Sequence, residues 1–251
     1  MIKKTLKISG IVVGIIFLLI AGFFAKSYFS VEARRNTHYK VIAQPITLEK
    51  DSSMLALGAR LVKAKGCTEC HGEDLGGKIF IDDPALGHLI ASNLTKGRGG
   101  LPQDYGLQDW VLALKHGIRR DGKPLLFMPS HEFTLLSEAD MAAIIGYCSD
   151  LSRVDRAFPE GNSLGPVGYV LTDLGKLPLF PAEMIDHERT LVKEVKAEIS
   201  VEYGKYLSTS CMGCHRENMK GGDPVATGFP VVADISSTGN VGKWSEEQFI
   251  N

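Results

Sequence analysis

The chain contains 251 residues, with 28 Lys and Arg against 29 Asp and Glu and a net charge of −1. Because the charges balance, the composition excludes a protein that binds nucleic acid through a strong basic field. The sequence also holds no convincing Ser/His/Asp spacing, Walker loop or glycine-rich dinucleotide fingerprint, so we predict no catalytic site of those kinds.

Residues 8–25 are uncharged and mostly apolar, which is near the lower length limit for a membrane-spanning helix. Lys3, Lys4 and Lys7 precede this segment, and the positive-inside rule then places the amino terminus in the cytoplasm and the rest of the chain in the periplasm. A cleaved signal peptide is the competing interpretation, but residues 21–30 lack a clean A-x-A site. We therefore expect residues 1–30 to form a cytoplasmic terminus and a single-pass anchor.

A predicted helix over residues 53–65 runs into the pentapeptide C-T-E-C-H, and a second pentapeptide, C-M-G-C-H, occurs at residues 211–215. C-x-x-C-H is the attachment motif of a c-type haem, in which both thiols become thioethers and the histidine binds the iron. Two copies predict two covalently bound haem c groups. The predicted covalent residues are Cys67, Cys70, Cys211 and Cys214, and the predicted axial histidines are His71 and His215.

Two other interpretations of these cysteines are weaker. A zinc site built from the four cysteines would leave the two histidines without a role, and structural zinc pairs usually lie closer in sequence. A thioredoxin-like motif needs a βαβ setting, which the sequence does not show.

Two further helices are predicted from apolar residues at helical spacing, over residues 107–116 and 137–151. Gly117 ends the first, and Ser137 begins the second in a Ser-x-x-Asp pattern. Cys148 lies on the apolar stripe of the second and is expected to be a small core residue. No strand or hairpin is predicted, so the fold class is all-α.

Met128 lies well downstream of His71 in the sequence and directly precedes Pro129. A thioether is a soft iron ligand, and proline stiffens the backbone that would carry it. From the residues alone, Met128 is equally well explained as a core side chain.

Internal similarity predicts two tandem domains. Gly58-x-x-Leu61 recurs as Gly204-x-x-Leu207, residues 71–77 match 215–222 with one extra residue, and residues 93–95 match 234–236. We expect a first domain at 49–151, an extended interdomain connector without a sustained helical period at 152–190, and a second domain at 191–251.

These motifs, together with residues 91–95, 108–111, His116-Gly117, Asp121-Gly122 and Met128-Pro129, resemble the bacterial membrane-anchored di-haem cytochromes c over residues 49–251. That family includes cytochrome subunits of periplasmic dehydrogenases. The resemblance implies that Met128 is the sixth ligand of the first haem iron and that the protein lies at the bacterial inner membrane. It also suggests Asn93 or Trp110 near the haem propionates, with simple packing an equal alternative for Trp110.

The second domain departs from this pattern because the counterpart of Met128 would fall beyond Asn251, and neither Met212 nor Met219 is placed to bind iron. Either the sequence is incomplete, so that the second domain is truncated and less stable, or the second haem is five-coordinate or uses another group.

The sequence therefore predicts an electron carrier and not an enzyme. Single electrons would pass from a periplasmic dehydrogenase or quinol-oxidising complex to a cytochrome or terminal oxidase. The alternative is a di-haem peroxidase-like enzyme with an open coordination site on the second haem.

Overall fold

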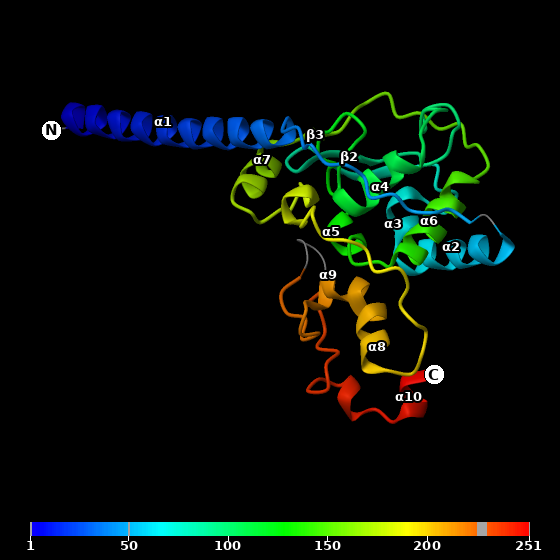
Figure 1. Ribbon diagram of the computed structural model, residues 1–251. Helices are drawn as coiled ribbons and strands as arrows, with labels where there is room; N and C mark the ends of the chain where they lie inside the picture. The colour runs from blue at the N-terminus through cyan, green and yellow to red at the C-terminus, as the bar shows by residue number, and fades with distance from the viewer. Residues whose placement is uncertain (1, 50, 225–229, 251) are drawn as a thin grey trace. The chain divides into compact units, whose positions relative to one another are not determined.

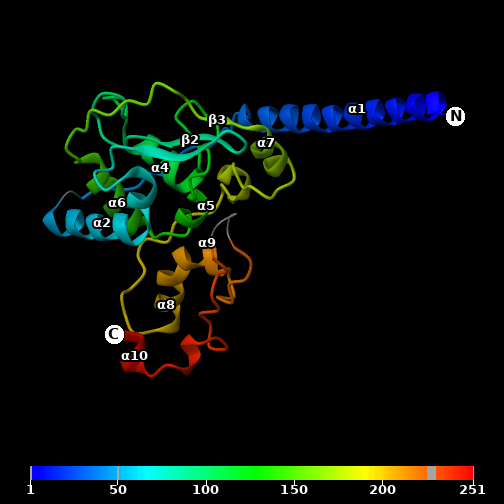
Figure 2. The ribbon, with the colours of Figure 1, turned by 180° about the vertical axis from the view of Figure 1, so that it is seen from behind.

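The computed structural model describes residues 2–49, 51–224 and 230–250, which form two compact units. Unit 1 contains Met1–Thr134 and Asp140–Thr190, and unit 2 contains Leu135–Ala139 and Leu191–Asn251. Figure 1 shows the elements in chain order, and Figure 2 shows them from behind. The described chain is mostly helical, as predicted, but it also contains a small sheet.

Helix α1 (Ile2–Arg35) begins the chain and continues past residue 30, where the anchor was expected to end. Its segment Leu6–Arg35 is the one helix among the described residues that is long and apolar enough to cross a membrane. Its large apolar side chains are exposed as far as Phe29, whereas Ser27 and Val31 are fully buried. The last turns of α1 are therefore part of the folded unit.

Three helices lie where the sequence predicts them. Asp51 caps the first by accepting a hydrogen bond from the Met54 amide, which satisfies a donor that has no partner within the helix. Gly117 ends the second at φ 64°, a left-handed conformation that glycine adopts without a Cβ clash. The third is buried from Met141 to Gly146 and again at Cys148. Their bounds are α2 (Ser52–Ala64), α4 (Leu107–His116) and α6 (Glu138–Ser149).

The backbones of α2 and α6 come very close at Gly58. A Cβ atom at this position would lie 2.1 Å from the carbonyl oxygen of Ala143 and 2.7 Å from the Cβ of Tyr147. One turn later on α2, Val62 is 2% exposed. Gly58, the glycine of the first Gly-x-x-Leu copy, therefore lies where α2 crosses α6, and only glycine fits there.

The prediction that the chain contains no strand is wrong. Strands β1 (Lys78–Asp83), β2 (Gly87–Ala91) and β3 (Ser163–Leu164) form an antiparallel sheet in the order β1-β2-β3. The register of β1 shifts between Ile79 and Ile81, so its sequence does not alternate cleanly. The two residues of β3 pair with a strand far away in sequence, which no local pattern reveals.

The connector expected at 152–190 is not extended along its whole length. Helix α7 (Pro166–Asp173) and the 3₁₀ helix η1 (Pro181–Met184) lie within it, and both begin with proline. Proline is favoured in the first helical turn, where the missing N–H has no partner to lose, so it starts these helices. Leu179 and Phe180 are at most 1% exposed and pack with Val31 and Leu89 in the core of unit 1.

The last turns of α1 are held to the segment that contains α7 by a dense set of polar contacts. Lys26 and Ser27 bond to Asp173 at 2.6 and 3.0 Å. Tyr169 donates to Glu32 at 2.8 Å. Arg34 forms two hydrogen bonds to Glu183, at 2.8 and 2.6 Å. Because these contacts recur over several turns, α1 is fixed to unit 1 and is not a loose tether.

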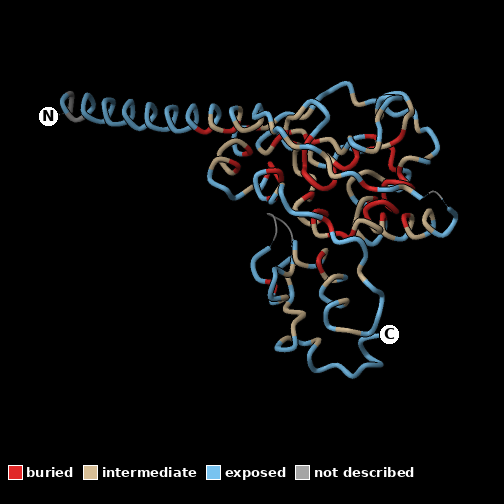
Figure 3. The backbone as a smooth tube through the Cα atoms, in the orientation of Figure 1, coloured by how far each residue is buried: buried red, intermediate tan, exposed pale blue. Residues whose placement is uncertain are grey.

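Unit 2 contains short helices and few buried residues, and Figure 3 shows its tube mostly in the exposed and intermediate colours. Ser200 caps α8 by accepting from the Tyr203 amide. The apolar side chains of Trp244 and Phe249 are 50% and 68% exposed. The elements are α8 (Val201–Leu207), η2 (Ser208–Cys211), α9 (Met212–His215), η3 (Val241–Lys243) and α10 (Glu246–Ile250), with α5 (Ser130–Phe133) belonging to unit 1.

Candidate haem-attachment sites

Helix α3 (Cys67–His71) carries the first predicted site. It lies between Gly66 at φ 73° and Gly72 at φ 82°, so two glycine turns isolate it from α2 and from the following loop. Residues three apart lie on one side of a helical turn, which places Cys67 and Cys70 together with His71 directly after them. All three side chains therefore come from one short turn, as a covalent haem site requires.

The ring of His71 is oriented by a backbone carbonyl. Its Nδ1 lies 2.7 Å from the oxygen of Ser92. A carbonyl can only accept, so Nδ1 carries the proton and the lone pair remains on Nε2. The loop that provides this carbonyl is itself fixed, because the Leu94 amide donates to Leu75 at 2.9 Å. The site thus presents a neutral imidazole in the tautomer that binds a metal through Nε2.

Asn93 has a structural role. Its side-chain nitrogen donates to the carbonyls of Val154 and Arg156, at 2.7 and 3.3 Å, and its oxygen accepts from both the amide and the hydroxyl of Thr95. The residue is 1% exposed. These bonds use both donors of the amide, so the suggested contact of Asn93 with a haem propionate is not supported. Trp110 is 5% exposed and packs edge-on against Tyr105.

The second predicted site has the same local hydrogen bonds. Nδ1 of His215, which ends α9, lies 2.8 Å from the oxygen of Ala233, and the Ile235 amide donates to Met219 at 2.9 Å. Asp234 takes the place of Asn93, because its carboxylate accepts from the amide and hydroxyl of Ser236 at 2.8 and 2.6 Å. The repeated tripeptides at 93–95 and 234–236 therefore brace the carbonyl that orients each histidine.

The alignment of the two motifs with one extra residue is wrong. The amide of Gly77 donates to His71, and the equivalent donor to His215 is Gly221, not Gly222. Leu75 and Met219 also share an unusual positive φ, at 53° and 58°. The copies match without insertion up to this point. Lys78 then pairs with Ala91, and Gly222 pairs with Val232, so the difference in length lies in the hairpin that follows.

Burial separates the two sites. Burial raises the pKa of Cys67 to about 11 and also raises the pKa of Cys70, so both are thiols at neutral pH. Burial likewise lowers the pKa of His71, which keeps its ring neutral. Cys211 and Cys214 are exposed. The first motif is thus the better enclosed of the two.

The residues of both motifs fit a covalently bound haem c. All four cysteines are free and unpaired, which leaves each sulfur available to form a thioether. Each histidine has its Nδ1 engaged by a carbonyl, so each can offer Nε2 to iron. No group of three or more His, Cys, Asp or Glu side chains that could hold a metal ion occurs among the described residues.

Met128 lies in unit 1, as does the first motif, in the loop between α4 and α5. Its amide donates to Leu126 and its carbonyl accepts from Ser130, both at 2.8 Å. The preceding residue, Phe127, has φ 62°, and its ring packs on Phe80 of β1 at 5.3 Å. The loop that holds the half-buried Met128 is therefore constrained on both sides. Its role as an iron ligand stays a prediction.

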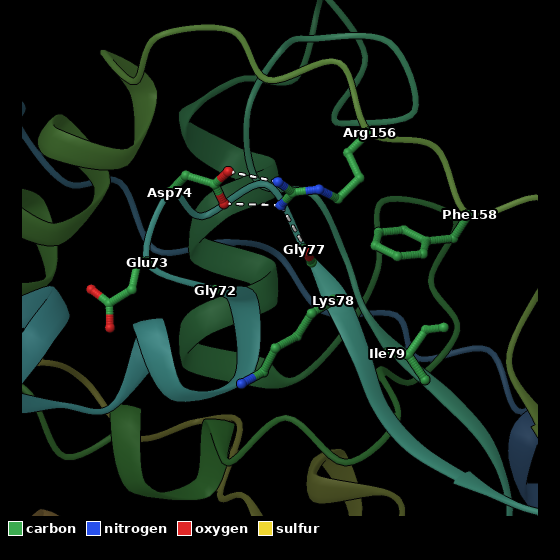
Figure 4. Close-up of a pocket in the computed structure, with 8 residues that line it drawn as sticks. All are labelled: Gly72, Glu73, Asp74, Gly77, Lys78, Ile79, Arg156 and Phe158. Atoms are coloured by element: carbon green, nitrogen blue, oxygen red, sulfur yellow. Dashed lines mark hydrogen bonds and ion pairs between the residues drawn. The ribbon is translucent and has the colours of Figure 1, made fainter.

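A pocket of about 530 Å³ lies directly after the first motif, lined by the 72–79 segment and by Arg156 and Phe158. Figure 4 shows the Arg156 guanidinium bound to both oxygens of Asp74 and to the carbonyl of Gly77, at 3.0, 2.8 and 3.1 Å. The guanidinium lowers the pKa of Asp74. None of the predicted site residues lines this pocket, so we do not assign it to the haem.

The buried His116 and the half-buried His187, which the sequence analysis did not connect, form a pair. Nδ1 of His116, at the end of α4, lies 3.0 Å from Nδ1 of His187, so one ring donates to the other. Burial, with added repulsion from Lys115 and His187, lowers the pKa of His116 to about 4. His187 lies far downstream in the sequence, and no sequence motif links the two.

The sequence analysis also missed the carbonyls of Ser92 and Ala233, which orient His71 and His215. The repeated tripeptides beside these carbonyls were the available signal.

Residues 55–152 match the cytochrome c family. The chain is 23% identical over 228 residues to the cytochrome c subunit of a quinone-dependent alcohol dehydrogenase from Gluconobacter oxydans, which covers 80% of this chain and 47% of that protein. It is 27% identical over 124 residues to the cytochrome subunit of fructose dehydrogenase from Gluconobacter japonicus, covering 47% and 25% of the two chains.

A third relative is the cytochrome c subunit of gluconate 2-dehydrogenase from Pantoea cypripedii, 26% identical over 104 residues, which covers 39% of this chain and 23% of the relative. In each comparison, the similarity spans less than half of the relative's length. The chain therefore spans less than half the length of these relatives, and the rest of each relative has no counterpart in the comparison.

Proposed function

We propose that this chain, which contains a cytochrome c domain and is related to the cytochrome c subunits of dehydrogenases, relays single electrons in a membrane-bound dehydrogenase complex. The observation that carries the proposal is the paired C-x-x-C-H motif with a carbonyl-oriented histidine in each copy. When bound, haem supplies a one-electron iron couple. The protein's part is to bind it, to orient its ligand and to set its environment.

At the first site, Cys67 and Cys70 would hold the haem through thioethers, and His71 would bind the iron through Nε2. Met128 would provide a sulfur ligand, which raises the reduction potential relative to a second nitrogen ligand. Support for this role comes from the constrained loop, because Phe127 packs on Phe80 and limits the positions open to Met128.

At the second site, Cys211, Cys214 and His215 would have the same roles, which gives two haem c groups in two tandem domains. Support comes from the Nδ1 contact of His215 with Ala233, since a bare C-x-x-C pair has no need of an oriented histidine. The named relatives are cytochrome subunits, which favours electron relay over the peroxidase-like alternative.

We further propose that α1 is an uncleaved single-pass anchor in the bacterial inner membrane, with the haem domains in the periplasm. Cleavage near residues 25–30 would remove Ser27 and would detach Lys26 from Asp173. It would also leave the fully buried Val31 close to a new chain end. Those contacts favour a retained helix. The donor would be a periplasmic dehydrogenase or a quinol-oxidising complex, and the acceptor a cytochrome or terminal oxidase.

The test is the mass of the full chain, produced in a host that matures c-type cytochromes and then extracted with acidic acetone. We expect a mass higher than that of the polypeptide by two haem groups. Cys67→Ser with Cys70→Ser should lose one haem, and Cys211→Ser with Cys214→Ser should lose the other. Cys148→Ser is the control, because Cys148 is a buried residue of α6 outside both motifs, and it should retain both haems. Pigment that is extracted completely into the solvent would refute the proposal.

A further inference from the structure

Helix α7 has two different faces. Gly168 and Thr172 are buried, and Tyr169 and Asp173 bond to α1. The other face carries an apolar stripe at helical spacing, formed by Val167, Val170, Leu171 and Leu174. Val167 and Leu174, two helical turns apart on this stripe, are 44% and 54% exposed. Val170 and Leu171 between them are half-buried, so the four side chains form one continuous and partly exposed apolar face, a candidate contact surface.

The position of α7 along α1 identifies that partner. Tyr169 packs against Phe24 and Tyr28, with ring centroids 6.5 and 4.9 Å away. In Figures 1 and 2, α7 and the turn after it lie against the last turns of α1, on the side of unit 1 from which the long apolar part of the helix projects. The partly exposed stripe is therefore beside the outer end of the proposed membrane span.

The depth of this contact follows from helix geometry. A hydrocarbon core of about 30 Å needs roughly 20 residues at about 1.5 Å each. Counted from Ile8, the first residue after Lys7, that length ends close to Tyr28. Phe24 and Tyr28 therefore lie at the outer boundary of the hydrocarbon, and α7, which contacts both, lies at the same depth.

We infer that α7 is an interfacial element that inserts its Val167–Leu174 stripe into the outer leaflet of the bilayer that α1 crosses. The aromatic rings of Tyr28 and Tyr169 are of the kind enriched at membrane interfaces. Lys176, exposed shortly after Leu174, is placed to meet lipid phosphates. The inference rests on the proposed membrane anchor.

One consequence is that unit 1 has a fixed orientation relative to the membrane. A single helix with a flexible linker would leave the first haem domain free to rotate. Here the pairs Lys26–Asp173 and Arg34–Glu183 fix α1 to the α7 segment, and insertion of the stripe would add a second membrane contact. Two contacts define the face that the domain presents to partners in the same membrane.

The test uses the full, haem-loaded chain in phosphatidylcholine nanodiscs that contain a lipid with a photoactivatable diazirine in its acyl chain. After illumination, the peptides that carry lipid adducts are identified by mass spectrometry. We expect adducts on the apolar part of α1 and on the peptide that contains α7. The double variant Val167→Glu with Leu174→Glu should lose the α7 adducts severalfold while α1 keeps its own.

Ile42→Glu is the matched control, because Ile42 is an exposed apolar side chain outside α7, at 94% exposure. It should leave the α7 adducts unchanged. An unchanged haem spectrum in each variant confirms that it is folded. Adducts on α1 without adducts on α7 would overturn the inference and leave the anchor intact. An absence of adducts from both helices would refute the anchor itself.

Discussion

Gly58 and Gly204 occupy the same place in the internal repeat but have different surroundings, and exchanging each for alanine should have opposite effects. A Cβ at Gly58 would lie 2.1 Å from a backbone oxygen of α6, whereas a Cβ at Gly204 would meet nothing within 4 Å. The same substitution therefore adds a clash in α2 and only a methyl group in α8. The comparison isolates helix packing from helix propensity.

Alanine stabilises a helix interior by about 1 kcal/mol relative to glycine, so Gly204→Ala should stabilise unit 2 by up to that amount. At Gly58 the same gain is outweighed, because overpacking a core costs about 1–3 kcal/mol and the obstacle here is backbone, which cannot change rotamer. We expect a net loss of about 2 kcal/mol for unit 1, which raises the population of opened states about 30-fold.

The measurement is amide hydrogen exchange of the full chain, resolved by peptide. Gly58→Ala should accelerate exchange in the α2 and α6 peptides, and Gly204→Ala should slow exchange in the α8 peptide up to about fivefold. Unchanged protection in α2 and α6 for Gly58→Ala would show that the helix contact at Gly58 is wrong. Equal destabilisation by both variants would show that the two positions are packed alike.

Three further outcomes are expected. Met128→Ala should abolish the weak far-red band of sulfur-ligated ferric haem and lower the reduction potential of the first haem. Met184→Ala is the control, because that side chain is 55% exposed, and it should change neither the band nor the potential. A band that survives Met128→Ala would contradict the ligand assignment. Hydrogen bonds from Lys26 and its neighbours lower the pKa of Asp173 to about 2, so its contribution is complete above the ordinary carboxyl pKa of 3.8 and is lost as the pH falls towards 2. The rate of peptic cleavage within α7 should rise as the pH falls from 3.8 towards 2, and Asp173→Asn should remove this dependence on pH. An Asp173→Asn variant with the same pH profile of cleavage would contradict the role of Asp173. Because the pKa of His116 is lowered from 6.5 to about 4, the stability that depends on its neutral form is complete above pH 6.5 and declines below it. The denaturant midpoint should fall between pH 7 and pH 5, with a smaller fall in His116→Gln, and equal falls in both proteins would rule out this pair as the cause.

Local signals made parts of the fold predictable. Two of the three predicted helices were recognised from apolar residues at helical spacing. Gly117 marked the end of one of them, and Ser137 marked the start of the other. Both C-x-x-C-H motifs were recognisable because haem attachment requires residues adjacent in the sequence; the haems themselves stay a prediction. The repeated tripeptides at 93–95 and 234–236 were seen but not understood, since their role depends on a hydrogen bond between distant positions, from His71 to Ser92 and from His215 to Ala233.

The features that were missed depend on distant partners. The hairpin of β1 and β2 has an irregular register, and β3 joins it from a remote part of the sequence. Helix α7 is hidden by its own proline, a residue that interrupts a helix at most positions and here begins one. The pairing of His116 with His187 and the burial of Leu179 follow from packing that no window of neighbouring residues contains.

Under the proposed function, the carbonyl of Ser92 would influence the reduction potential of the first haem. A stronger bond from Nδ1 to that carbonyl makes the imidazole a better electron donor and lowers the potential of the metal it ligates. Ser92 is adjacent to Asn93, which the carbonyl of Val154 holds at 2.7 Å. Substitutions near Val154, which is far from His71 in the sequence, should therefore adjust the driving force for electron transfer without touching any iron ligand.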